Sequence, residues 1–183
     1  MGSDAVILTR LFSSHHRGSS SPFNFSGTQP ISMAMRAEGE IKYCCEIAQP
    51  THCLITNIGT AHLEQLGSRE AIARAKSEIF YPGSKVFLNE SMDFFKFLHE
   101  TALLQKCSVS VFQAENVLEQ NEALVKQAAL SLGLTLAQIQ AGLTQPLLSA
   151  HRMRVLRSFN GAQMIHDTYN ANPDSMSYFI QRL

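Results

Sequence analysis

The chain has 183 residues, of which 45% are hydrophobic and 16% are charged, and its formal net charge is zero at neutral pH. This balance is ordinary for a globular protein that is long enough to bury a core. No run of about eighteen apolar residues occurs, so the sequence predicts no membrane span. No Lys/Arg-rich run and no interleaving of basic and aromatic residues is present, which argues against nucleic-acid binding.

The four cysteines are expected to be buried free thiols of a protein in the reducing cytoplasm. They are Cys44, Cys45, Cys53 and Cys107. A zinc site built from the first three and His52 is an alternative, but the spacing of these residues is not a standard one for zinc.

Short apolar runs alternate with segments of helical periodicity along the chain. This alternation predicts an α/β fold, in which a parallel sheet is covered by helices on both faces. In such sheets, ligands bind beyond the carboxyl ends of the strands. The predicted strands are residues 31–36, 53–58, 85–89 and 108–112, and the predicted helices are residues 39–48, 68–81, 93–104, 116–132 and 135–142.

The helical spacing also predicts which apolar side chains face the core. Ile47 in the first helix, Leu104 in the third and Val125 in the fourth belong to this predicted set. Gly133 is expected at the C′ position that ends the fourth helix, and Thr135 is expected to cap the fifth.

The predicted domain organisation has three parts. Residues 1–30 are rich in serine and are expected to be poorly structured, with only Ala5–Leu8 suited to a short strand. Residues 31–145 form the central α/β domain. Residues 151–183 begin a second α/β domain, which is incomplete because one strand pair and one short helix cannot bury a core.

The second domain is expected to begin with a hairpin. Strands over residues 154–159 and 162–167 flank Asn160-Gly161, a dipeptide that predicts a type I′ turn. Asn172 then resembles a helix N-cap, with Pro173 at the first helical position.

The stretch Leu54–Phe80 organises the predicted central domain, because it reads as a strand, a polar loop and a helix. The loop presents His62 and Glu64 beyond the carboxyl end of the strand, and Ser68 is the predicted N-cap of the helix. Polar side chains at that edge of a parallel sheet are placed to meet a ligand.

Lys76 lies on or beside the apolar stripe that Ile72, Ala75 and Ile79 form at helical spacing. Burial of a lysine is costly unless the amine is paired or chemically altered. From spacing alone, a lysine that extends its amine to solvent is the favoured interpretation.

Several motifs in this stretch resemble the Mur ligase family, in particular the members that add D-alanyl-D-alanine to a UDP-N-acetylmuramoyl-tripeptide. A later motif is similar to the nucleotide-contacting segment that opens the third domain of that family. The match covers residue 31 to the C-terminus. The motifs are Thr56-Asn57, Ala61-His62-Leu63-Glu64, Gly67-Ser68, Ala73-Arg74-Ala75-Lys76-Ser77-Glu78-Ile79-Phe80, and His166-Asp167-Thr168-Tyr169-Asn170-Ala171-Asn172-Pro173-Asp174-Ser175-Met176.

The resemblance implies an ATP- and Mg²⁺-dependent amide (peptide) ligase of peptidoglycan precursor synthesis, which acts through an acyl phosphate. It implies UDP-N-acetylmuramoyl-tripeptide and D-alanyl-D-alanine as substrates, a cytoplasmic location and a monomer. Residues 31–145 would be part of the ATP-binding central domain.

The resemblance also reverses the interpretation of Lys76, because the family lysine at this position is carbamylated by CO₂. An ammonium would repel Mg²⁺ and phosphates, whereas a carbamate is an anion with oxygen donors. The uncharged amine is the form that reacts with CO₂, and apolar surroundings favour it. His62 matches the family's metal-ligating histidine, and Glu64 would support the metal ligands or act on the substrate side.

By resemblance, the catalytic residues are Lys76, His62 and Arg152, and the metal ligands are His62 and the carbamate of Lys76. Arg152 would face the terminal phosphate of the nucleotide, with Arg154 as an alternative in register. The late motif also satisfies an ordinary Asx-rich turn followed by a helix cap. The nucleotide-binding residues implied are Asn57, Arg152, Asp167, Tyr169, Asn170 and Asn172.

The sequence departs from the family pattern in four respects. It contains no Gly-x-x-x-x-Gly-Lys-[Ser/Thr], the loop whose backbone N–H groups and lysine hold phosphates. Ser32 stands where the family carries a metal-binding glutamate, the span Ser108–Glu115 is short, and the UDP-binding domain is absent. We therefore expect a fragment or a degraded homologue that is inactive alone. The alternatives are a folylpolyglutamate synthase-like ligase and a non-catalytic remnant or binding module.

Overall fold

The computed structural model describes residues 5–11, 27–115, 117–144, 154–166, 176–177 and 180. The chain divides into two compact units, which are described separately. The core unit is Ser3–Ile58 with His62–Ala128, and the C-terminal unit is Ala129–Leu183 with Met1–Gly2 and Gly59–Ala61. The predicted domain boundaries stay a prediction.

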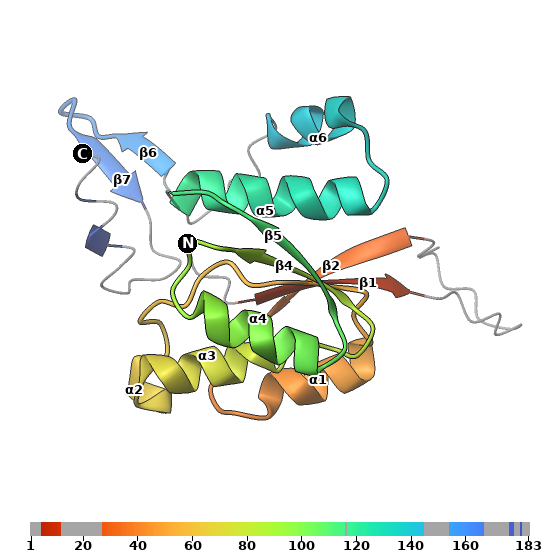
Figure 1. Ribbon diagram of the computed structural model, residues 1–183. Helices are drawn as coiled ribbons and strands as arrows, with labels where there is room; N and C mark the ends of the chain where they lie inside the picture. The colour runs from red at the N-terminus through yellow and green to blue at the C-terminus, as the bar shows by residue number, and fades with distance from the viewer. Residues whose placement is uncertain are drawn as a thin grey trace, which may run out of the picture. The chain divides into compact units, whose positions relative to one another are not determined.

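The core unit is built on a five-stranded sheet with the order β2-β1-β3-β4-β5 (Figure 1). The strands β3, β4 and β5 are parallel, whereas β1 is antiparallel to both of its neighbours. The predicted α/β fold with a parallel sheet is confirmed, and an antiparallel pair extends one edge of that sheet. The bounds are β1 Ala5–Leu11, β2 Gly27–Met33, β3 His52–Leu54, β4 Lys85–Asn89 and β5 Ser108–Phe112.

Three strands of the core unit differ from their predicted bounds. β1 extends to Leu11, and β2 begins at Gly27, so both strands run into the segment that was expected to be poorly structured. The two strands pair along their whole length, from Ala5↔Met33 to Leu11↔Gly27, and this pairing supplies the hydrogen bonds that local composition does not indicate. β3 ends at Leu54 rather than at residue 58, although Ile55 and Ile58 remain buried beyond it.

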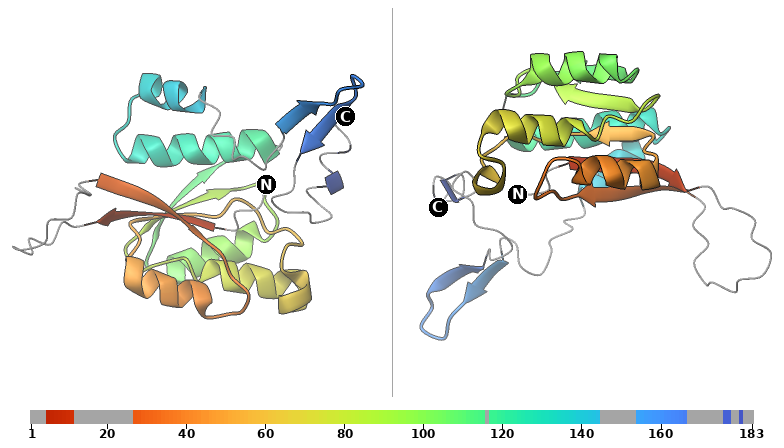
Figure 2. Two further views of the ribbon diagram at one scale, coloured as in Figure 1. Left: turned by 180° about the vertical axis from the view of Figure 1, so that it is seen from behind. Right: turned by 90° about the horizontal axis from the view of Figure 1, so that it is seen from below.

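Helices cover both faces of the sheet, as predicted (Figures 1 and 2). α1, α3 and α4 lie on one face and α5 lies on the other. A short helix, α2, was not predicted and occupies the polar loop after β3. The bounds are α1 Glu40–Ala48, α2 Leu63–Leu66, α3 Arg69–Ser77, α4 Phe95–Leu104 and α5 Val117–Ser131.

Alternate residues of the central strands pack into two separate apolar clusters, because successive side chains of a strand point to opposite faces. Val86 and Leu88 pack with the helices α1, α3 and α4. Phe87, between them, packs on the other face against Leu124 and Ala128 of α5. Both faces of β4 are therefore buried, which is why it reads in the sequence as a continuous apolar run.

The predicted N-cap of α3 is confirmed, whereas its predicted end is not. Ser68 Oγ accepts a hydrogen bond from the N–H of Ala71 at 3.1 Å. α3 ends at Ser77, and the N–H groups of Glu78, Ile79 and Phe80 then donate to carbonyls three residues earlier. This tighter winding after the last α-helical turn shortens the helix by four residues relative to the prediction.

The helical periodicity predicted the centre of each buried stripe correctly and its margin incorrectly. Ile72, Ala75 and Ile79 are all buried. Ile47 and Leu104 are instead exposed, by 69% and 82%. Val125 is also about half exposed, because neighbouring helices and strands cover only the middle of each stripe.

The C-terminal unit contains α6 (Leu136–Leu143) and a hairpin of β6 (Arg154–Arg157) and β7 (Gln163–His166). Thr135 caps α6 through a capping box with Gln138, which confirms the predicted cap. No helix among the described residues is long and apolar enough to cross a membrane.

The turn of the hairpin differs from the predicted type I′ turn. That type needs positive φ at both Asn160 and Gly161, but only Gly161 has it, at 82°. The N–H of Gly161 donates to the carbonyl of Ser158, and the N–H of Ser158 donates to that of Ala162. The connection is therefore a three-residue loop with glycine in the left-handed position, and Asn160 Oδ1 accepts a hydrogen bond from Ala162 N–H at 3.1 Å.

Candidate ligand site at the carboxyl ends of the parallel strands

Lys76 is among the largest fully buried side chains of the chain, with 1% of its surface exposed. It lies in the last turn of α3, and its Nζ donates a hydrogen bond to the carbonyl oxygen of Asn57 at 3.0 Å. Asn57 belongs to the loop that follows β3. The interpretation that Lys76 extends its amine to solvent was wrong, because the side chain is buried and its amine donates a hydrogen bond to the backbone at the ligand edge of the sheet.

A cavity of about 180 Å³ opens at the carboxyl ends of the three parallel strands, and we call it the carboxyl-end cavity. Asn57 and Ile58 line it after β3, Asn89 lines it at the end of β4, and Ala114 lines it after β5. This is the edge at which parallel α/β sheets bind ligands. The full lining is Asn57, Ile58, Asn89, Ser91, Met92, Asp93, Ala114, Glu115 and Gln120.

Asn89 joins the loops that follow β4 and β5. Its Nδ2 donates to the carbonyl of Ala114 at 2.9 Å, and its Oδ1 accepts from the N–H groups of Ala114 and Ser91 at 3.1 and 3.2 Å. Asn89 is only 2% exposed, so three otherwise unpaired backbone groups depend on one buried amide. Sequence reasoning did not select Asn89, although a polar residue at the carboxyl end of a predicted parallel strand is a usable signal.

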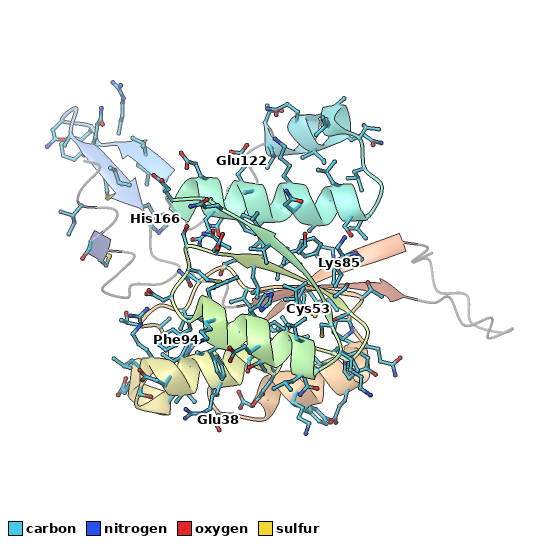
Figure 3. The ribbon with its side chains drawn as sticks, viewed as in Figure 1. Glu38, Cys53, Lys85, Phe94, Glu122 and His166 are labelled. Atoms are coloured by element: carbon cyan, nitrogen blue, oxygen red, sulfur yellow. The ribbon has the colours of Figure 1, made fainter. Side chains whose placement is uncertain are left out.

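Arg69 joins the loops that follow β3 and β4. Its Nη2 donates to the carbonyl of Ile58 at 2.7 Å and forms an ion pair with the Asp93 carboxylate. The guanidinium carbon lies 5.5 Å from the ring centroid of Phe94, which Figure 3 labels at the start of α4. No local pattern indicated these contacts, because Arg69 and Asp93 are 24 residues apart.

His62 and Glu64 lie on α2, in the same connection between β3 and α3 that carries Asn57. His62 occupies the N-cap position with φ of 70°, and it is half-buried. Glu64 is exposed in the first turn of this helix. The structure therefore joins Lys76 to Asn57, and the expected proximity of His62 to Lys76 stays a prediction.

The other residues that the resemblance assigns to the nucleotide site lie in parts of the chain that the structure does not describe. They are Arg152, Asp167, Tyr169, Asn170 and Asn172. Arg154, the alternative to Arg152, is the first residue of β6. Ser32, which stands where the family would have a metal-binding glutamate, is exposed in β2.

Two of the four cysteines, Cys53 and Cys107, lie at the opposite end of the sheet, where the parallel strands begin. Cys53, Ser84 and Cys107 form a thiol network, in which Ser84 Oγ lies 3.3 Å from Cys53 Sγ and 3.5 Å from Cys107 Sγ. Cys53 also donates to the carbonyl of Ile79, and Cys107 donates to that of Tyr81. All four cysteines are free thiols. Within the described part of the chain, no group of three or more His, Cys, Asp and Glu side chains could hold a metal. The alternative zinc site of Cys44, Cys45, His52 and Cys53 is therefore not formed.

Burial keeps these thiols protonated. It raises the pKa of Cys53 to about 11, against the opposing effect of the hydrogen bond with Ser84. Burial, followed by the nearby Cys53, Cys44 and Glu78, raises the pKa of Cys45 to about 12. The thiolate is the form that reacts and binds metal, so these cysteines are structural rather than reactive.

A parallel α/β domain with a polar cavity at the carboxyl ends of its strands has the architecture of the α/β domains that bind ligands at this edge of the sheet. Residues 31–151 match the family model described as the Mur ligase middle domain. The chain therefore belongs to the Mur ligase family.

Curated relatives and solved structures agree with this assignment. The chain is 31% identical over 191 residues to the UDP-N-acetylmuramoyl-tripeptide–D-alanyl-D-alanine ligase of Mycobacterium tuberculosis, covering 84% of this chain and 38% of the relative. It is 29% identical over 182 residues to the protein of the same name from Bacillus subtilis, covering 82% and 40%. A crystal structure of MurF from Acinetobacter baumannii superimposes with a TM-score of 0.72 at 29% identity, over 80% of this chain and 40% of that one. The chain thus spans about 40% of the length of these relatives.

Proposed function

We propose that the chain is part of an ATP-dependent ligase that joins D-alanyl-D-alanine to UDP-N-acetylmuramoyl-tripeptide through an acyl phosphate. The names of the relatives support this substrate pair and favour it over a folylpolyglutamate synthase-like reaction. The four free thiols suit the reducing cytoplasm, where we place the activity.

The observation that carries the proposal is the buried amine of Lys76 at the ligand edge of the sheet. A buried ammonium is costly, and conversion to a carbamate would give the side chain an anionic, oxygen-bearing end. In this proposal the carbamate and the imidazole of His62 would hold Mg²⁺. Two protein ligands suit Mg²⁺, since this ion commonly keeps water and substrate phosphates in its remaining positions. Bound Mg²⁺ would neutralise phosphate charge during acyl phosphate formation.

The carboxyl-end cavity suits an uncharged group of the nucleotide better than its phosphates. Its two ionisable lining residues, Asp93 and Glu115, are both carboxylates; because Arg69 pairs with Asp93, Glu115 is the one that would chiefly repel phosphate oxygens. Its amides and backbone groups can instead hydrogen-bond a planar heterocycle. We therefore place the adenine base in this cavity, with Asn57 between the base and Lys76. The phosphates would lie toward Lys76, His62 and Arg152, with Glu64 on the substrate side and Asp167, Tyr169, Asn170 and Asn172 contacting the nucleotide from the second domain.

The proposal is tested by ¹³C NMR of the 183-residue chain in ¹³C-labelled bicarbonate and MgCl₂. We expect a carbamate resonance that disappears in Lys76→Met and persists in Lys42→Met, because Lys42 is exposed on α1. Methionine keeps an unbranched side chain at position 76, which limits the packing loss. Identical spectra of the wild type and Lys76→Met would contradict the assigned role of Lys76.

The 183-residue sequence contains no phosphate loop, and Ser32 stands where the family would have a metal-binding glutamate; the serine favours a second candidate, a remnant that has kept the fold without catalysis. Phosphoryl transfer relies on positioning and charge stabilisation, to which the backbone cradle and its lysine contribute most directly. We expect no phosphate release when residues 1–183 are supplied with ATP, Mg²⁺ and both proposed substrates. A carbamate resonance without turnover would agree with a fragment, whereas loss of both would favour the remnant.

A further inference from the structure

Arg69 is the first residue of α3, and the helix itself does not favour an arginine at this position. The N-terminus of a helix carries partial positive charge, so a cation in the first turn is locally unfavourable. The neighbouring Glu70 suits the same position much better. The side chain of Arg69 must therefore be stabilised by contacts outside its helix.

These contacts connect two loops that line the carboxyl-end cavity. Arg69 Nη2 bonds the carbonyl of Ile58 after β3 and the carboxylate of Asp93 after β4, and both Ile58 and Asp93 line the cavity. The Nε of Arg69 is buried and has no hydrogen-bond partner among the described residues, so the contacts of Nη2 set the orientation of the guanidinium at some cost.

The guanidinium also lies over Phe94, whose backbone is strained. Phe94 has φ of 62°, a left-handed conformation that bulky residues rarely adopt and that costs on the order of 1 kcal/mol or more. It is the N-cap residue of α4 and makes no side-chain capping hydrogen bond. The cation–π contact at 5.5 Å with Arg69, together with the adjacent ion pair of Asp93, helps to hold this strained turn beside the cavity.

We infer that Arg69 is a positioning residue, which fixes the separation of the two cavity loops and cancels the charge of Asp93 at the cavity rim. The inference rests on the proposed function, since it takes the ligand to be the adenine end of a nucleotide. A lysine could not replace Arg69 fully, because a single ammonium lacks the planar fork that bonds a carbonyl and a carboxylate while it stacks on a ring.

The experiment compares Arg69→Gln with Arg74→Gln in the 183-residue chain. Arg74 is a matched control, because it lies on the same helix and makes an exposed ion pair with Glu38 at 3.4 Å, away from the cavity lining. Amide hydrogen exchange is measured at residues 57–58 and 91–94 without ligand, and adenosine and ATP are titrated by NMR. Far-UV circular dichroism checks that both variants are folded.

We expect faster exchange in both loops of Arg69→Gln and about ten-fold weaker adenosine binding, equivalent to the loss of one charge-assisted contact. ATP binding should weaken more than adenosine binding, because the unpaired Asp93 would then repel an anion. The double variant Arg69→Gln, Asp93→Asn should recover part of the ATP affinity but none of the loop protection. Arg69→Lys should recover the charge effect alone. Arg74→Gln should match the wild type in every measurement.

The outcomes separate this inference from the proposed function. If the wild type binds neither adenosine nor ATP, the nucleotide assignment of the cavity fails, and hydrogen exchange alone then decides the role of Arg69. If Arg69→Gln exchanges and binds as Arg74→Gln does, the positioning role is overturned. If Arg69→Gln does not fold, Arg69→Lys takes its place, and wild-type exchange in that variant would overturn the role.

Discussion

The two ends of the parallel strands β3, β4 and β5 bury groups of very different chemistry. The carboxyl end buries the amine of Lys76 and the amide of Asn89, each bonded to backbone of the loops around the carboxyl-end cavity. The opposite end buries the thiol network, whose partners are a serine hydroxyl and backbone carbonyls of the connection between α3 and β4.

Both ends contain residue types that often react, but their surroundings differ. Burial raises the pKa of Cys53 and leaves it an inert thiol. Lys76 instead reaches a loop beside a cavity that can admit a ligand. A buried residue of a reactive type therefore indicates function through its position in the sheet, because the carboxyl ends of the parallel strands converge on one ligand edge.

The largest expected effect is at Asn89. Asn89→Ala would leave the N–H groups of Ser91 and Ala114 and the carbonyl of Ala114 without partners, so we expect the free energy of unfolding to fall by about 3 kcal/mol. Urea denaturation measures this loss. Asn89→Asp keeps the acceptor but replaces the donor by a buried carboxylate oxygen that faces the carbonyl of Ala114, so it should also lower the free energy of unfolding. Equal stability of Asn89→Ala and the wild type would show that the two loops do not depend on this amide.

The thiols should make the free energy of unfolding sensitive to alkaline pH. The folded-state pKa values of Cys53 and Cys45, about 11 and about 12, lie above the ordinary value of 9.0. Below pH 9 both states are protonated, and above it only the unfolded state ionises, so stability is lost as pH rises from 9 toward 12. We expect a loss of about 2–3 kcal/mol between pH 8 and pH 10 from these two groups.

Urea denaturation at pH 8, 9 and 10 measures the alkaline loss, and Cys45→Ala, Cys53→Ala provides the comparison. The double variant cannot ionise at these positions, so its stability should change less over the same range. A parallel decline in both proteins would assign the alkaline loss to other groups.

The smallest effect is expected for Cys53→Ala at pH 7. The substitution removes hydrogen bonds with the carbonyl of Ile79 and the hydroxyl of Ser84 and leaves a small void, which should cost about 1–2 kcal/mol. Adenosine affinity and the carbamate resonance should not change, because the thiol network lies at the end of the sheet away from the cavity. A change in either readout in a folded Cys53→Ala protein would contradict the division between the two ends.

The helix caps and two of the strands could be predicted from the sequence, because they depend on residues that are close together in the chain. Ser68 and Thr135 cap their helices as predicted, because a cap depends on residues within one turn. Apolar periodicity likewise located β4 and β5 at their observed bounds. The pairing of β1 with β2 was missed because it joins segments on either side of a serine-rich stretch.

The candidate site was predicted only where sequence motifs carried it. The family resemblance selected Lys76 and Asn57, which the structure joins by a hydrogen bond. Asn89 and Arg69 were missed because their partners Ala114 and Asp93 lie 25 and 24 residues away, and neither helical nor strand periodicity encodes such a distance. The Asn160-Gly161 pattern predicted a turn correctly, but the three-residue loop that closes the hairpin sets the φ angles, and it left Asn160 out of the left-handed region.

The strand order β2-β1-β3-β4-β5 bears on how the chain folds as it leaves the ribosome, because it places β1 inside the sheet. A nascent β1 can pair with β2 as a hairpin, but its other side stays open until β3 has been made. About forty residues separate the end of β1 from β3, so at about 5–20 residues per second this side stays open for about two to eight seconds. An open strand edge is a template for pairing with another chain, and this interval is when we expect chaperones to protect the growing polypeptide most.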